Sequence, residues 1–182
     1  MIPALETPSL LLKPLDADDA AATQELFPHW EIVKYLAAKV PWPYPPDGAR
    51  RFYLDVAQPA MARGEAWHWS LRLKEHPGRL IGCINLQLGE DDNRGFWLAL
   101  PYHGRGLMTE ACEAVTDFWF DRLGFPRLRV PKAAANRSSR RISQKLGMRL
   151  VAAGEKDFVA GRLPSEIWEI TAPEWRVVRA GR

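Results

Sequence analysis

The sequence predicts a mixed α/β fold of the α+β type, with a mostly antiparallel sheet of about seven strands flanked by helices. Three strand-like segments in the middle of the chain are joined by short turns, which is typical of an antiparallel meander. Two segments with helical periodicity come next, and further strand-like segments lie between and after them. Because the strands first form a run and then enclose helices, we expect a mixed sheet rather than a regular β–α–β repeat.

The N-terminal third is expected to contain one strand and two helices. Residues 9–15 are an apolar run closed by Pro14, and they form the first predicted strand. Asp16 can cap a helix over residues 17–27 with its side-chain oxygens. A second, shorter helix is expected over residues 30–36.

A proline cluster at residues 41–46 separates these helices from the next one. The cluster fits a rigid extended connection, and it also fits one wall of an acceptor site. Its aromatic candidates for that wall are Trp30, Trp42 and Tyr44. Residues 47–63 then have helical character, and Pro59 should kink or break that helix because proline lacks an N–H donor.

The three strands of the meander are expected over residues 66–73, 80–88 and 94–100. In the first of these, Trp67 and its alternate neighbours form an apolar face opposite His68 and its alternate neighbours. Turn-forming residues stand between the strands. The pattern predicts a sheet with one buried face.

Two helices and three further strands complete the prediction. Residues 106–123 carry an apolar stripe with acidic residues opposite, which is typical of an amphipathic helix. Asn136 and Gly147 bracket a second helix as its N-cap and its C-terminal stop. The last two strands should be joined by a turn at Gly161 and Pro164. The remaining strands are expected over residues 127–130, 148–158 and 166–171.

Composition and charge exclude several classes of function. The chain has 182 residues, 47% hydrophobic and 26% charged, which fits a single domain over residues 1–182. A net charge of +3 argues against a nucleic-acid partner, and no apolar run approaches the length of about 18 residues that spans a bilayer. We therefore expect a cytoplasmic protein with no nucleic-acid or membrane partner, and leave a homodimer open. Cys83 and Cys112 lack metal-ligand spacing, so both should be buried small hydrophobic residues and no metal is expected.

The passage around residues 103–108 carries the most chemical information. Free N–H groups at a helix start, together with the helix dipole, make an anion site. Gly104 and Gly106 allow positive φ angles and close approach of the backbone to a phosphate, and Arg105 adds a positive charge. The same spacing also fits a plain tight turn between a strand and a helix. The glycine patterns of Walker-type NTPases and Rossmann folds are not found here.

At this loop the sequence resembles the GNAT acetyltransferases, and within them the RimJ/RimL-type branch that acetylates protein N-termini. The family's pyrophosphate loop reads Gln/Arg-x-x-Gly-x-Gly/Ala, and this chain has HGRGLM at residues 103–108. His103 thus departs from Gln or Arg, and Met108 departs from the small residue. A second match, NRSS at residues 136–139 followed by KLGM, resembles the branch's Asn-x-x-Ser…Lys-x-Gly-Phe signature. Shorter similarities lie at residues 7–15, 95–98 and 168–175, so the resemblance covers nearly the whole chain.

The resemblance implies a GNAT fold whose sheet is splayed between its fourth and fifth strands, with the pantetheine of acetyl-CoA lying in the splay. A β-bulge would produce such a divergence, and we expect it at residues 98–100. Arg140 and Lys145 belong to a basic cluster with Arg137 and Arg141, which fits either the CoA 3′-phosphate or a solvated helix face. The residues expected to bind acetyl-CoA are Leu98, Ala99, Leu100, His103, Gly104, Arg105, Gly106, Leu107, Met108, Thr109, Asn136, Ser139, Arg140 and Lys145.

The resemblance also implies direct attack of a primary amine on the thioester, without a covalent enzyme intermediate. The amine belongs to a protein N-terminus or to a small molecule. Ser139 is expected to protonate the leaving thiolate, and Asn136 to contact the pantetheine. Many relatives have a glutamate where this chain has Asn93, so the general base must lie elsewhere, and Glu155 is favoured. The alternatives are His68, Asp91, Asp92, Asp157 and a water chain, and a chain without any base would be a catalytically inactive CoA-binding module.

Overall fold

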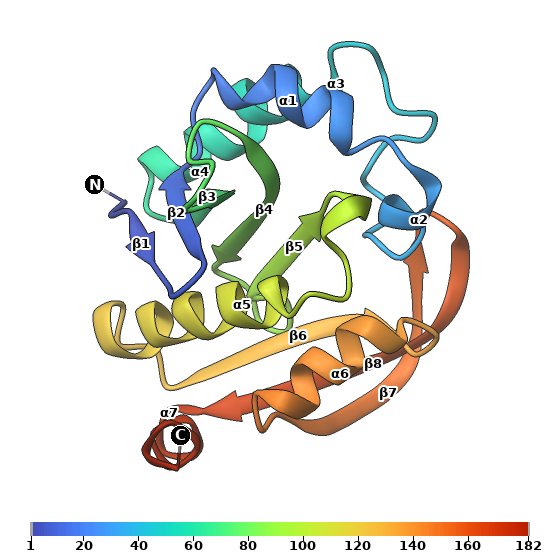
Figure 1. The fold of residues 1–182 in the computed structure, drawn as a ribbon. Helices are drawn as coiled ribbons and strands as arrows, with labels where there is room; N and C mark the ends of the chain where they lie inside the picture. Colours follow the sequence, from blue (N-terminus) through green and yellow to red (C-terminus); the bar gives the residue numbers. More distant parts are fainter. Residues whose placement is uncertain (1, 182) are drawn as a thin grey trace.

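The structure is a computed structural model that describes residues 2–181. Its strands form two antiparallel sheets with the orders β1–β2–β3–β4–β5 and β6–β8–β7 (Figure 1). The expected mixed α/β fold is confirmed, although its strands divide between two sheets. The strands are β1 (Leu5–Glu6), β2 (Leu10–Pro14), β3 (Ala66–Leu73), β4 (Leu80–Gln87), β5 (Arg94–Leu98), β6 (Arg127–Ala133), β7 (Arg149–Phe158) and β8 (Gly161–Thr171).

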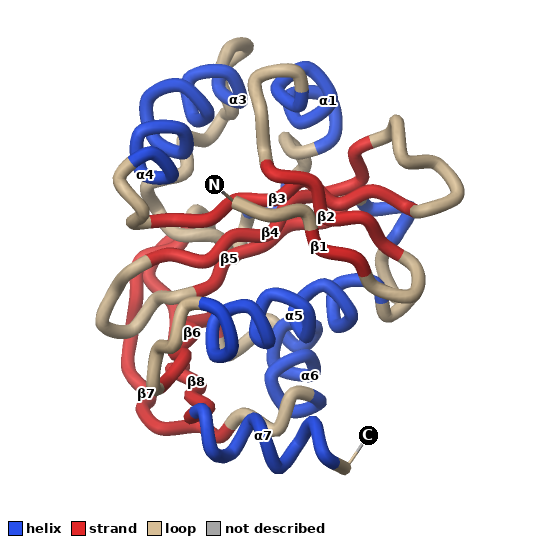
Figure 2. The backbone as a smooth tube through the Cα atoms, turned by 90° about the vertical axis from the view of Figure 1, so that its left-hand side faces the viewer, coloured by secondary structure: helices blue, strands red, loops and turns tan. Residues whose placement is uncertain are grey.

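Helices cover both faces of the first sheet. Figure 2 shows α1, α3 and α4 on one face and α5 on the other, with α6 and α7 beyond α5. The single buried face expected for residues 66–73 is therefore wrong, because His68, Ser70 and Arg72 are buried as well. The helices are α1 (Asp19–Leu26), α2 (Trp30–Val33), α3 (Gly48–Arg51), α4 (Gln58–Ala62), α5 (Leu107–Asp117), α6 (Arg137–Lys145) and α7 (Ala172–Ala180).

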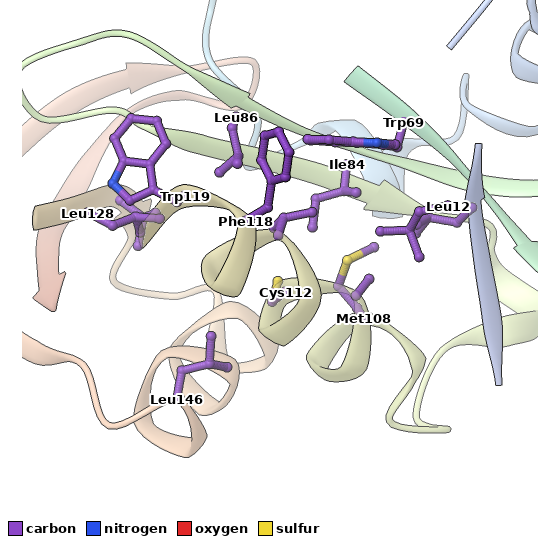
Figure 3. Packing of buried hydrophobic residues seen from close by; sticks show 14 of the residues in the cluster. Leu12, Trp69, Ile84, Leu86, Met108, Cys112, Phe118, Trp119, Leu128 and Leu146 are labelled. Carbon is purple, nitrogen blue, oxygen red and sulfur yellow. The ribbon is translucent and has the colours of Figure 1, made fainter. Parts of the chain in front are cut away.

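The hydrophobic core lies between the first sheet and α5. Phe118, just after α5, rises toward Trp69 of β3 (Figure 3), and the two rings meet edge to face at 5.3 Å. The same cluster of buried residues includes Leu128 of β6 and Ile170 of β8. Both sheets thus share one core, which fixes β5 and β6 relative to each other.

Pro59 changes the type of helix rather than ending it. A π-helical turn, Phe52–Ala57, connects α3 to α4, and Pro59 stands in the first turn of α4. A proline removes one N–H donor and crowds the carbonyl of the preceding turn, and a wider turn accommodates both effects. The chain stays helical on both sides of Pro59, so the predicted alternative of a break is wrong.

Several predicted boundaries are wrong. The first helix begins at Asp19, and the Asp16 side chain accepts from the N–H of Asp18 at 3.0 Å without capping the helix. Gly161 and Pro164 lie inside β8. The hairpin turn is formed by residues 159–160, just before Gly161.

Helix α7 was not expected at all. Thr171 and Glu174 form a reciprocal capping box at its start, and a proline follows Thr171 by two positions. This Thr-x-x-Glu spacing is the signal in the sequence that could have located the helix. Within residues 2–181, no helix combines the length and the apolar character needed to cross a membrane.

Candidate active site

The two sheets meet at the start of β5 and separate along it. The N–H of Asn93 donates to the carbonyl of Arg129, and the N–H of Arg129 donates to Asn93 Oδ1, both at 2.8 Å. Asn93 Nδ2 also donates to the carbonyl of Gly89 at 2.7 Å. A side-chain oxygen therefore takes the place of a main-chain acceptor at this point, and among the described residues β5 and β6 do not pair as strands. The fourth and fifth strands predicted from the sequence correspond to β5 and β6. The predicted splay between them is therefore the separation of β5 from β6.

The expected β-bulge at residues 98–100 is wrong. The pairing of β5 with β4 is regular from Arg94 to Leu98. The strand then ends, and a 3₁₀ turn, Leu100–Tyr102, follows. The splay arises at the Asn93 end of the strand, so no irregularity at the other end is required.

A cleft opens where β5 and β6 part. Residues from both strands form its walls, residues just after α2 cover it, and the start of α6 closes it. The lining residues are Tyr35, Leu36, Arg94, Gly95, Phe96, Val130, Pro131, Lys132, Asn136 and Ser139. Two residues of the sequence prediction, Asn136 and Ser139, are therefore brought together at this cleft.

Three residues expected at the pantetheine lie outside the lining of this cleft. The carbonyl of Leu98 is 2.7 Å from His103 Nε2, and the N–H of Ala99 donates to Ile81 at 2.8 Å. Leu100 is exposed in the turn that follows. The assignment of these three residues to the pantetheine stays a prediction.

The loop before α5 presents unpaired donors. Gly104 and Gly106 have φ angles of +74° and +77°, as expected. No side chain caps α5. Within residues 2–181, the N–H of His103 donates to Leu100, whereas the main-chain N–H groups of residues 104–109 have no acceptor. The start of α5 is thus an open anion site, with its positive dipole end facing outward.

Two residues of the loop motif contribute only their main chain to this site. The side chains of Leu107 and Met108 are buried in the core. Met108 stands where the family motif has a small residue, and its larger side chain packs into the core under the first sheet. The main-chain donors of the loop therefore stay accessible.

The N-cap of α6 is confirmed. Asn136 Oδ1 accepts from the N–H of Ser139 at 3.2 Å. Ser139 is half-buried, and its Oγ accepts a hydrogen bond from Lys132 Nζ at 3.1 Å. Lys132 is a lining residue that the sequence did not single out, because a lysine at the end of a strand normally reaches solvent. Burial lowers the pKa of Lys132 to about 7.

The basic cluster on α6 divides into two parts. Arg140 Nε is 3.0 Å from Glu166 Oε2 of β8, so Arg140 turns toward the sheet. Arg137, Arg141 and Lys145 are exposed on the helix. A phosphate in solvent could reach the exposed guanidinium groups of Arg137 and Arg141.

The carboxylates considered as general bases lie around the cleft but do not line it. The side chain of Glu155 is 62% exposed and its Oε2 is 3.1 Å from Arg162 Nε. Asp157 also contacts Arg162, and Asp91 pairs with Arg129 at 2.7 Å. Asp92 differs from these, because burial raises its pKa, and Lys156 lies 3.8 Å away.

His68 and the two cysteines are also placed away from the cleft lining. His68 packs its ring 5.7 Å from Phe52, and burial lowers its pKa to about 4, so it is neutral at pH 7. Burial raises the thiol pKa of Cys112, which keeps it from being a thiolate nucleophile. Cys83 is only partly buried, contrary to expectation. Within the described chain, no three His, Cys, Asp or Glu residues gather in a metal-binding arrangement.

A family model described as an acetyltransferase (GNAT) domain matches residues 9–149, more than half of the chain. The chain belongs to the GNAT acetyltransferase family. The proteins that this chain is similar to include several whose names describe ribosomal acetyltransferases. YdaF of Bacillus subtilis (strain 168), provisionally named a ribosomal N-acetyltransferase, is 30% identical over 76 residues. That match covers 40% of this chain and 42% of YdaF, less than half of either protein.

Solved structures show the GNAT fold over almost the whole chain. RimL, described as a ribosomal L7/L12 alpha-N-protein acetyltransferase in complex with coenzyme A, superposes with a TM-score of 0.79 at 15% identity. The superposition covers 93% of this chain and 98% of RimL. The ribosomal-protein-S5-alanine acetyltransferase of Vibrio fischeri gives a TM-score of 0.78 at 16% identity, covering 95% and 98%.

Proposed function

We propose that this protein transfers the acetyl group of acetyl-CoA to a primary amine. The observation that carries the proposal is the row of unpaired N–H groups at residues 104–109, at the uncapped start of α5. A diphosphate needs several converging donors, and this loop offers them without side-chain competition. The exposed guanidinium of Arg105 adds charge to the same loop. The residues present therefore fit coenzyme A.

The cleft between β5 and β6 is the site that we assign to the pantetheine. Gly95 and Phe96 supply an edge of β5 that is not paired within its own sheet. Asn136 and Ser139 stand on the opposite side of the cleft. An extended, amide-containing arm can add hydrogen bonds along a free strand edge, as peptides do. We assign all of residues 1–182 to one catalytic domain, because the core joins both sheets.

In the proposed reaction the neutral amine attacks the thioester carbonyl directly. Ser139 donates its hydroxyl proton to the thiolate that leaves. A base must remove a proton from the amine, and the chain offers Glu155, the base favoured by the sequence, and Asp92, whose raised pKa suits the task better. Comparing Glu155→Gln with Asp92→Asn tests this assignment, because only loss of the true base lowers turnover at saturating substrate.

We propose a protein N-terminus as the acceptor. The names of RimL and the Vibrio fischeri enzyme describe ribosomal proteins as substrates, and the name of YdaF describes a ribosomal N-acetyltransferase. Trp30 and Trp42 support an extended acceptor. Both are exposed, and their rings lie 5.8 Å apart, close in sequence to Tyr35 and Leu36 of the cleft lining. Tyr44 is less suited, because it packs against Phe27.

A second candidate is a catalytically inactive CoA-binding module. It is favoured by the position of the candidate carboxylates, none of which lines the cleft among the described residues. The experiment is to incubate the protein with acetyl-CoA and a panel of amines, and to measure free CoA thiol and acetylated product. The panel contains peptides with different N-terminal residues and small amines such as polyamines. Turnover with a peptide supports the proposal, and tight CoA binding without turnover on any acceptor supports the inactive module.

A further inference from the structure

Lys132 is a buried cation in the wall of the cleft. It is 4% exposed, on β6. Its Nζ donates to Ser139 Oγ and to the Ser139 carbonyl, both at 3.1 Å, and also to Ser143 Oγ. Within residues 2–181, it forms no ion pair with a carboxylate. Its Nζ also lies 5.8 Å from the centroid of the Trp168 ring. A buried ammonium that contacts only neutral oxygens and an aromatic ring is costly, so a functional reason for it is worth seeking.

We propose that Lys132 is a positioning residue that orients Ser139 and resupplies the proton that Ser139 gives to the leaving thiolate of CoA. The inference rests on the proposed function. It concerns the acid side of the reaction and is independent of which carboxylate is the base.

The hydrogen bonds of Ser139 carry the orientation argument. Its Oγ accepts from Lys132, and the hydroxyl donates to no group within the described residues. One lone pair of the oxygen is thus occupied by Lys132, while the hydrogen stays available for a group in the cleft. A serine hydroxyl with this arrangement is prepared to donate rather than to accept.

The surroundings of Lys132 explain how it can give up a proton. Burial opposes its charge most strongly, and the nearby cations Arg94 of β5 and Arg140 of α6 oppose it further. Cys112 of α5 and Glu166 of β8 act in the opposite direction. The resulting pKa of Lys132 is about 7, compared with 10.5 for an ordinary lysine. Lys132 is therefore able to lose a proton at neutral pH, which an ordinary lysine does not do.

The proton movements balance as follows. When the C–S bond of the tetrahedral intermediate breaks, its electron pair moves to sulfur, and sulfur takes the hydroxyl hydrogen of Ser139. The oxygen of Ser139 takes a proton from Lys132 Nζ, which becomes neutral. The acetylated amine gives its extra proton to the general base, and Lys132 regains a proton from water after CoA leaves. No serine alkoxide accumulates, which would otherwise be unfavourable near pH 7.

The first test is a double-mutant cycle with Lys132→Met and Ser139→Ala. Methionine fills a similar volume without charge, so we expect a folded protein. We expect kcat to fall about ten- to a hundredfold in Lys132→Met with little change in KM for acetyl-CoA, a range at the low end for acid–base groups. Because Lys132 acts through Ser139, the double variant should be no slower than Ser139→Ala. Independent, multiplying losses would overturn the proposal, as would wild-type kcat in Lys132→Met.

Lys132→Arg separates charge from proton supply. Arginine keeps a positive charge but holds its proton at any accessible pH. The wild-type kcat should decrease as pH rises through about 7, and this decrease should be missing in Lys132→Arg. An unchanged pH profile would overturn the relay. Lys74→Met, at an exposed lysine paired with Glu6, is the matched control and should keep the wild-type profile.

A direct measurement needs no acceptor. The ¹⁵N chemical shifts of the lysine Nζ groups, titrated by NMR and assigned with Lys132→Arg, should show one lysine with a pKa near 7. A value near 10.5 would overturn the proposal. If the wild type transfers acetyl groups but Lys132→Met is equally active, the relay is wrong and the proposed function stands. If the wild type acetylates no amine, the proposed function itself fails, and the relay with it.

Discussion

Ser139 combines a helix-start position with a place on the cleft wall. Its N–H is bound by Asn136, its Oγ by Lys132, and its hydroxyl hydrogen is left for the cleft. The residue is thus held by its main chain and by its side chain at once. This anchoring is what an acid needs if it is to meet a sulfur atom at a fixed place.

Ser139→Ala is expected to lower kcat by about ten- to a thousandfold, because water replaces the lost hydroxyl only in part. The KM for acetyl-CoA should change little. Ser138→Ala, at the exposed neighbouring position, is the matched control and should retain wild-type kcat. Steady-state kinetics with the best acceptor of the panel measure both. A wild-type kcat for Ser139→Ala would remove this residue from the chemistry.

His68 predicts a pH dependence of stability. Its pKa is about 4 in the folded chain and about 6.5 when unfolded, so the unfolded state binds a proton first as pH falls. Neutral His68 makes its full contribution to the free energy of unfolding above pH 6.5. That contribution is lost as the pH falls from 6.5 to about 4. The loss should reach roughly 3 kcal/mol, at about 1.4 kcal/mol per unit.

Urea unfolding of the wild type and of His68→Gln between pH 7 and pH 4.5 measures this effect. The variant should be less stable at pH 7, and it should lose less stability on acidification. His76→Gln, on an exposed turn, should follow the wild type. Parallel curves for the wild type and His68→Gln would contradict the buried, neutral state.

At the scale of elements, the loop and the start of α5 act as one unit. Gly104 and Gly106 have positive φ angles, and a Cβ at either would meet no atom within 4 Å. The requirement for glycine is therefore set by backbone conformation, and the space in front of the loop is open. That space is where we expect the diphosphate.

Gly106→Trp is expected to weaken CoA binding at least tenfold, since the indole would fill the space before the free N–H groups. Any side chain at this φ also costs about 1–2 kcal/mol of stability. Gly64→Trp is the matched control, because Gly64 has a φ of +70°, equally open surroundings and a place in the turn before β3. Both variants should lose similar stability, while only Gly106→Trp should lose affinity for CoA in calorimetry. Equal affinities would exclude the loop from the site.

At the scale of the whole molecule, Asn93 joins the two sheets at the closed end of the splay. Asn93→Ala leaves the N–H of Arg129 without its acceptor, whereas water can replace the partner of the exposed Gly89 carbonyl. An unmet group inside the molecule costs about 1–3 kcal/mol, so we expect a loss of about this size in the free energy of unfolding. Asp91→Asn, in the same turn, removes only a partly exposed ion pair with Arg129 and should cost less than about 1 kcal/mol. Urea unfolding measures the stability of both variants. Equal losses of stability would show that Asn93 does not hold the two sheets together.

The accuracy of the sequence prediction depended on how local each feature is. The N-cap and the C-terminal stop of α6 and the positive φ angles of the loop follow from neighbouring residues, and they are confirmed. The burial of both faces of β3 and the lining of the cleft depend on distant segments. For that reason the sequence did not identify Arg94, Gly95 and Phe96 of β5 as residues that line the cleft.

By itself, the sequence determined the mixed α/β class, the glycine loop before α5 and the helix that carries Ser139. These depend on backbone preferences and on periodicities within a few turns. Only the tertiary structure decided that Asn93 links β5 to β6 at the end where they part, and that Lys132 is buried against Ser139. Both depend on packing between segments far apart in the chain. Such packing sets the dielectric surroundings and the hydrogen-bond partners of a side chain, which its sequence neighbours do not specify.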